Sequence, residues 1–190
     1  MIIKCLANKG LDLPKEYLVP ASNYNEKHIF PVNINQLYVV YGMTIFSGYV
    51  WYFLMDNIHD YPFWHPSPLF SVSDGQLSRY WVYSVSHQES KSQTRYLWTF
   101  PEWANFPGFY DDLVDGKKAA CDIFFAYKLK IDLEFPNPSI TLQAEILDGS
   151  WLMCPSCIDA WETDSKDGMV FCPKCLQIMH NPFFKRGPGL

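Results

Sequence analysis

Residues 151–175 read WLMCPSCIDAWETDSKDGMVFCPKC and contain two cysteine pairs with the same internal spacing. The first pair is Cys154-Pro155-Ser156-Cys157 and the second is Cys172-Pro173-Lys174-Cys175. A tight turn between two cysteines directs both sulfur atoms toward one point, so two such turns offer four thiolates arranged as a tetrahedron. In a reducing compartment, paired motifs of this kind favour a metal ion over disulfides.

Cys154, Cys157, Cys172 and Cys175 therefore predict one bound Zn²⁺ ion. Four sulfur ligands close the coordination shell, which makes the ion structural rather than catalytic. Strand-forming residues precede both turns, at 151–152 and 169–171, so residues 149–182 have the layout of a zinc ribbon. Two disulfides or free thiols without metal are the alternatives, and a tetrahedral sulfur site also accepts iron.

The chain before the cysteines is rich in β-branched and aromatic residues, which strands prefer. Turn signals such as Asp56-Asn57 and Ser73-Asp74-Gly75 separate short runs of these residues. Pro62, Pro66 and Pro68 force an extended, non-helical connection between two of the runs. Several short strands with turns between them are typical of a small barrel or sandwich. The expected strands are residues 2–7, 37–41, 49–55, 69–72, 81–85 and 96–100.

Residues 109–135 change to a helical pattern, because apolar residues recur there at spacings of three and four. Gly116 is expected to separate a first turn from the main helix, and Pro136 ends the pattern. A further short strand is expected at residues 140–144. We therefore predict a mainly β fold of the α+β class. Its parts are a β-barrel with the following helix in residues 1–148, the zinc ribbon in 149–182 and a loose tail in 183–190.

The composition is that of a globular chain with many aromatic residues. Its 190 residues carry a net charge of −5 and are 17% aromatic. An acidic chain has no long-range attraction for nucleic acid phosphates, so the charge disfavours nucleic acid and favours a basic protein as partner. The most apolar stretch, residues 37–55, contains too many polar residues and glycines for a membrane span. The N-terminus lacks a signal-peptide pattern, so we expect a cytoplasmic protein with no membrane partner.

No constellation of catalytic side chains is apparent in the sequence, and we expect a protein that is not an enzyme. An enzyme would have to assemble a pocket from distant residues, for instance His59, His65 and Glu102. Cys121 lies within the expected helix and is interpreted as a small hydrophobic residue rather than a nucleophile. His180 is a further candidate metal ligand, although a surface histidine is the simpler interpretation.

The densest acidic stretch of the chain is the candidate partner-binding surface. Exposed aromatic side chains beside it, Trp103 and Phe106, would favour binding of a partner at such a surface. The aromatic loop at residues 59–68 is a second candidate contact. The simpler interpretation of the carboxylates is compensation of the helix dipole at a solvated helix start. The candidate partner-binding residues are Glu102, Trp103, Asp111, Asp112, Asp115 and Trp64.

Several segments resemble a group of bacterial proteins. The segments YVVYGM (38–43), WYFL (51–54), PLFSVSD (68–74) and SRYW (78–81) look like a bacterial SH3-like β-barrel. The segments PGFYDDLVDG (107–116) and DLEFP (132–136) are similar to a helix of the same proteins. These proteins resemble immunity proteins encoded beside secreted antibacterial toxins. The resemblance covers about residues 28–180 and implies binding and neutralisation of a cognate toxin without catalysis. Apart from the zinc cysteines, it transfers no functional residue.

The sequence leaves three hypotheses for the function. A binding protein that neutralises a basic toxin agrees with the acidic charge, the aromatic residues and the closed metal site. The alternative is a nucleic-acid-associated zinc-ribbon protein, because zinc ribbons and SH3-like barrels both serve this role elsewhere. The acidic charge opposes that alternative, since only Lys117-Lys118 and Lys185-Arg186 are paired cations. An enzyme is the third hypothesis.

Overall fold

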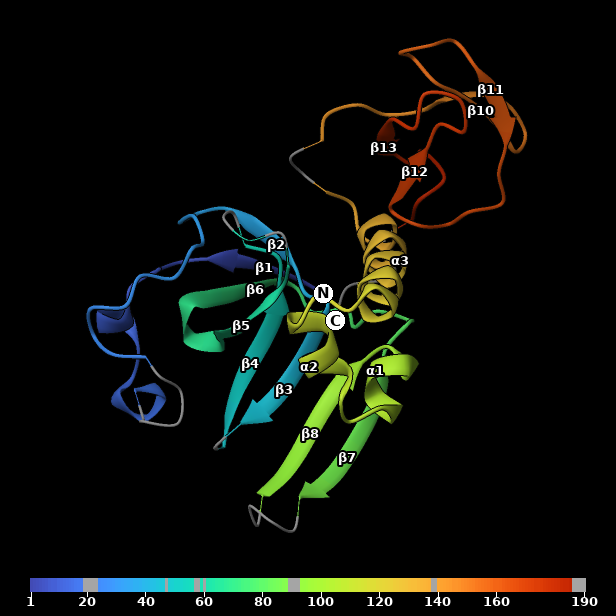
Figure 1. Cartoon of the computed structure of the whole chain (residues 1–190). Coiled ribbons are helices and arrows are strands. Elements are labelled where there is room, and N and C mark those ends of the chain that lie inside the picture. The colour runs from blue at the N-terminus through green and yellow to red at the C-terminus, as the bar shows by residue number, and fades with distance from the viewer. Residues whose placement is uncertain are drawn as a thin grey trace. The chain divides into compact units, whose positions relative to one another are not determined.

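In the computed structural model, the chain divides into two compact units, Met1–Lys128 and Leu129–Leu190 (Figure 1). The structure describes residues 1–18, 24–46, 48–56, 59, 61–88, 93–137 and 140–185. Strands outnumber helices, and the predicted mainly β, α+β class is confirmed. The expected boundary between residues 148 and 149 falls inside the second unit.

The first unit contains two antiparallel sheets. One has the order β2-β1-β6 and consists of β1 (Ile2–Cys5), β2 (Leu37–Val39) and β6 (Phe70–Asp74). The other has the order β5-β4-β3-β8-β7. Its strands are β3 (Gly42–Phe46), β4 (Tyr49–Leu54), β5 (Phe63–Pro66), β7 (Val82–Gln88) and β8 (Gln93–Thr99). Where the structure describes the chain, its short 3₁₀ helices include η1 (Gly10–Asp12), η2 (Lys15–Tyr17) and η4 (Ser67–Leu69).

Aromatic side chains fill much of the core of the first unit. The ring centroid of Phe53 on β4 lies 4.6 Å from that of Trp103, 4.8 Å from Trp64 and 6.0 Å from Phe124. Phe53, Trp103 and Phe124 are all buried. Aromatic pairs of this kind contribute about 0.5–1.5 kcal/mol each beyond the area they bury. The high aromatic content of the chain is therefore used largely inside the fold.

Three helices follow the large sheet: α1 (Pro101–Asn105), α2 (Phe109–Val114) and α3 (Lys118–Glu134). The predicted break at Gly116 is confirmed, because this residue has a φ of 70° between α2 and α3. Helix α1, which contacts β7, β8 and α2, was not predicted. Pro101 fits the first position of this helix, where its missing N–H is not needed.

The second unit contains two small antiparallel sheets. One has the order β11-β10-β9 and consists of β9 (Glu145–Asp148), β10 (Trp151–Met153) and β11 (Ala160–Glu162). The other pairs β12 (Met169–Phe171) with β13 (Ile178–His180). Leu152, Val170 and Met179 form its core together with Cys154 and Cys172. The core of this unit is therefore built around the cysteine pairs.

Several predicted elements differ from the structure. The stretch 37–55 holds three strands rather than two, because Gly42 begins β3 instead of ending a strand. The prediction of a strand at 140–144 is wrong, because the strand in this region is β9, at Glu145–Asp148. Part of the proline-rich connection forms β5, at the edge of its sheet, where proline is tolerated. Phe183, expected in a loose tail, packs on the core of the second unit. Residues 186–190 of that tail lie outside the described residues.

Candidate metal centre

The two cysteine pairs lie on turns with matching backbone hydrogen bonds. In the first turn, the N–H of Cys154 donates to the carbonyl of Asp159, and the N–H of Ile158 donates to the carbonyl of Cys154, both at 2.9 Å. The second turn repeats both bonds at 2.9 Å with Cys172, Gln177 and Leu176. The repeated Cys-Pro-x-Cys sequence therefore folds into two equivalent turns, which we call the knuckles.

The knuckles bring all four predicted ligands together. The Sγ atoms of Cys154 and Cys175 are 3.7 Å apart, and those of Cys157 and Cys172 are 3.6 Å apart. All four sulfur atoms lie within 4.8 Å of one another. A tetrahedral site with Zn–S bonds of about 2.3 Å separates its sulfurs by about 3.8 Å, whereas a disulfide needs about 2.05 Å. The four cysteines are thus free thiols placed to hold one metal ion.

The electrostatics of the cluster favour a bound cation. Burial raises the pKa of the Cys154 thiol, but the N–H groups of Cys157 and Ser156 and the neighbouring thiols outweigh burial and lower it to about 7. For Cys157, the N–H of Asp159 lowers the pKa, while burial and the other thiols raise it, to about 12. Cys154 and Cys157 therefore do not both ionise near neutral pH unless a positive charge offsets their repulsion, and a metal ion would supply that charge.

Side chains beyond the cysteines tie the end of β13 to the loop before β12 and to residue 140. The amide of buried Asn181 donates to the carbonyls of Ser165 at 3.0 Å and Asp167 at 2.8 Å. Its own carbonyl accepts the N–H of Phe183 at 3.0 Å. His180 is half-buried and donates from Nε2 to the carbonyl of Ile140 at 2.6 Å. The surface interpretation of His180 is therefore wrong, and its ring supports the chain rather than joining the sulfur cluster.

The structure corrects one predicted partner-binding residue. Trp103, expected to be exposed, is only 1% exposed. Its ring packs on Phe53 and Phe109 because the short helix α1 turns it toward the sheet. Trp64 is half-buried, and its ring centroid lies 5.7 Å from that of Trp103. Both tryptophans thus belong to the aromatic packing of the first unit, while Phe106 is 52% exposed as predicted.

The predicted acidic residues are exposed or half-exposed, but they interact with groups of the same chain. Asp112 forms an ion pair with Lys117. Burial lowers the pKa of Arg95, and the negative charge of Asp111 raises it in turn, so these two charges interact. Glu102 accepts a hydrogen bond from the Tyr127 hydroxyl at 3.1 Å. The negative charge of this part of the predicted surface is therefore partly neutralised by other groups of the same chain.

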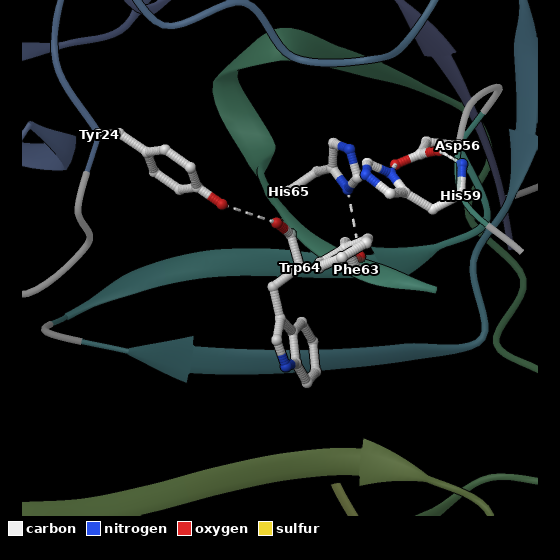
Figure 2. A network of polar contacts seen from close by, with 6 residues as sticks. All are labelled: Tyr24, Asp56, His59, Phe63, Trp64 and His65. Carbon is white, nitrogen blue, oxygen red and sulfur yellow. Dashed lines mark hydrogen bonds and ion pairs between the residues drawn. The ribbon is translucent and has the colours of Figure 1, made fainter. Parts of the chain in front are cut away.

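Each of the two histidines that flank the aromatic loop makes its own polar contact (Figure 2). Nδ1 of His59 donates to the Oδ2 atom of Asp56 at 2.7 Å, and Asp56 is buried. Nδ1 of His65 donates to the carbonyl of Phe63 at 3.1 Å. Burial lowers the pKa of His65 to about 4, although Phe63 and Asp56 oppose the shift. His65 is therefore neutral at physiological pH and is a structural side chain of the first unit.

The residues named for an enzyme pocket have separate roles in the structure. His59 is bonded to Asp56, His65 to the carbonyl of Phe63, and Glu102 to Tyr127 on α3. Cys121 is half-buried on α3. Sequence reasoning missed Asn181, although an asparagine just after a strand is a common side-chain tie to backbone. It also missed Ile158 and Leu176, which lie in left-handed backbone conformations with φ of 60° and 59°.

The chain was compared with known proteins. No family model, curated protein or solved structure matches it. Among the described residues, no helix has the length and apolar character needed to cross a bilayer. The SH3-like and immunity-protein resemblances therefore stay predictions from sequence, and the sulfur cluster carries the functional argument.

Proposed function

We propose that the second unit is a zinc ribbon in which Cys154, Cys157, Cys172 and Cys175 bind one structural Zn²⁺ ion. The observation that carries this proposal is the spacing of the sulfur atoms, 3.6 and 3.7 Å for the two measured pairs. Zinc in a closed four-sulfur shell stabilises the fold and offers no open position to a substrate. The small core of this unit has few other sources of stability, so metal binding and folding are coupled.

Elemental analysis of the purified chain tests the metal. Protein prepared under reducing conditions should contain one zinc per chain, and Cys172→Ser should lose it. Co²⁺ added to metal-free protein should produce the visible absorption of a tetrahedral thiolate site, because cobalt shares zinc's coordination preferences. A chain that is folded in its second unit without any metal, or that contains two disulfides when freshly isolated, contradicts the proposal.

The whole chain, in this proposal, is a non-enzymatic binding protein that neutralises a basic antibacterial toxin. The ribbon's charge supports a basic partner, because residues 145–180 contain six carboxylates and two lysines. A zinc ion bound by four thiolates adds a net charge of about −2. Such a surface accelerates association with a basic protein and repels nucleic acid.

Affinity capture from a lysate of the native organism, followed by mass spectrometry, tests the partner. A single co-purifying basic toxin domain, whose toxicity the chain abolishes when the two are co-expressed, supports the proposal. Retention of nucleic acid, or of ribosomal or polymerase components, contradicts it and favours the nucleic-acid-associated alternative.

A further inference from the structure

The outer face of the β9–β10–β11 sheet carries an exposed tryptophan. Leu152 on β10 is buried, and its cross-strand neighbour Trp161 packs on the same core. Because side chains alternate along a strand, Trp151 and Met153 point to the opposite side. Trp151 is 46% exposed, although large aromatic side chains are usually covered.

Carboxylates flank this tryptophan on both neighbouring strands. Trp151 lies directly opposite Asp148 of β9 and directly opposite Glu162 of β11. Residues opposite each other in antiparallel strands have Cβ atoms about 5 Å apart and share a face of the sheet. A register shift of β9 at this point sets both Asp148 and Glu145 opposite outer-face residues of β10. Glu145, opposite Met153, adds a third carboxylate in the next row. We call this set, Trp151 with Glu145, Asp148 and Glu162, the Trp151 face.

The charges of the Trp151 face are not neutralised within the ribbon. Among the described residues, none of its three carboxylates has a cationic partner. The two lysines of the ribbon are engaged elsewhere: Lys174 pairs with Asp159 at 3.6 Å, and Lys166 lies 5.2 Å from the Phe183 ring centroid. The hydroxyl of Ser150 donates to Glu162 at 2.8 Å, which holds this carboxylate beside the indole.

We propose that the Trp151 face is a docking surface for a basic segment of a partner protein. An arginine or lysine of that segment lies over the Trp151 indole and between Asp148 and Glu162. An indole is the strongest cation–π acceptor among protein side chains, and flanking carboxylates add ion pairs to the same cation. A second copy of this acidic face, an anionic membrane or a nucleic acid would meet like charge there. This inference rests on the proposed function, because it names the surface that such a binding protein uses.

Titration of the zinc-loaded full chain with a hexa-arginine peptide tests the surface. In spectra of ¹⁵N-labelled protein, the Trp151 indole signal, assigned by its loss in Trp151→Leu, and the amides of β9–β11 should shift saturably. A hexa-glutamate peptide should shift none of them. Shifts confined to the acidic residues of α2, or the absence of saturable shifts on the ribbon, overturn the proposal.

Matched variants separate the site from overall charge. Trp151→Leu keeps every carboxylate and should weaken peptide binding about two- to fivefold, the loss of one exposed cation–π contact. The double variant Asp148→Asn/Glu162→Gln should weaken binding at least as much and reduce its salt dependence. The control Asp111→Asn/Asp115→Asn removes the same number of charges from the first unit and should have the smaller effect. Equal effects of the two double variants overturn the proposal, and zinc content checks that each variant is folded.

A captured natural partner distinguishes the two proposals. If the wild-type chain binds a basic toxin and the Trp151→Leu and Asp148→Asn/Glu162→Gln variants bind it equally well, only the docking surface is wrong. If the chain captures no such protein while the hexa-arginine shifts appear as described, the docking surface holds and the toxin partner is wrong.

Discussion

Ile158 and Leu176 occupy the same position in the two knuckles, directly after the second cysteine of each pair. Both have left-handed backbone conformations, with φ of 60° and 59°. Glycine adopts this conformation without cost, whereas another residue loses roughly 1–2 kcal/mol. Their side chains are 68% and 69% exposed, so contacts within the chain offset little of this free-energy cost. The knuckles therefore store strain at two single residues.

Leu176→Gly should stabilise the ribbon. We expect a gain of about 0.5–1 kcal/mol, because removal of the left-handed strain exceeds the added chain entropy of glycine. Competition with a chelator for zinc measures this gain, because a more stable ribbon retains its metal more tightly. Leu176→Ala removes nearly the same side chain but keeps the strained conformation, so it should change retention little. Equal gains for the two variants would show that strain is not the cause.

His65 should make the first unit sensitive to acid. Burial lowers its folded-state pKa to about 4, below the ordinary value of about 6.5 in the unfolded chain. Between these values the unfolded state binds the proton and the folded state does not, so stability falls as the pH drops from 6.5 to 4. The loss is on the order of 3 kcal/mol.

Urea unfolding of the wild type and of His65→Asn at pH 7.5 and pH 5.0 measures this effect. The wild type should lose more free energy of unfolding than the variant over this interval, while zinc release and the other histidines affect both proteins alike. A variant with the same pH dependence as the wild type would contradict the assignment of His65 as a buried neutral side chain.

Gly168 lies where the loop before β12 approaches the end of α3. The N–H of Gly168, just before β12, donates to the carbonyl of Glu134 at the end of α3 at 3.1 Å. A Cβ atom at residue 168 would lie 2.4 Å from the backbone nitrogen of Pro136 and 2.7 Å from the carbonyl carbon of Phe135. Only a residue without a side chain permits this approach of the loop to the end of the helix.

Gly168→Ala should therefore loosen the ribbon. The clash is with backbone atoms, which cannot rotate away, so we expect a loss of about 1–3 kcal/mol. Thermal unfolding of the zinc-loaded protein measures the change. Gly149→Asn serves as the control, because nothing lies within 4 Å of its added Cβ and asparagine tolerates its φ of 50°. A loss in the control as large as that in Gly168→Ala would argue against a specific clash.

The whole chain consists of two units with separate cores, and only the second contains the sulfur cluster. Cys172→Ser should therefore loosen residues 150–182 and leave the first unit folded, and chelation of zinc should have the same effect. Limited proteolysis with mapping of the cleavage sites measures this. Cleavage throughout residues 28–128 in the variant would show that the two units do not fold separately.

Local patterns account for the parts of the structure that the sequence predicts. The cysteine spacing predicts the sulfur cluster because each pair is brought together by its own turn, independently of the rest of the chain. The break at Gly116 and strand β12 are likewise governed by neighbouring residues. Helix α1 and strand β3 were missed because proline and glycine permit more than one local conformation.

Exposure and charge pairing depend on residues far apart in the chain. Trp103 and Trp151 are both tryptophans beside acidic residues, yet the first is buried against β4 and the second lies on an open sheet face. The charge of Asp111 interacts with that of Arg95, whereas Asp148 and Glu162 both lie opposite Trp151. Sequence therefore identifies the metal ligands, since each Cys-Pro-x-Cys turn is local. The burial and electrostatic surroundings of the other candidate residues come from tertiary packing, because those surroundings belong to other segments of the chain.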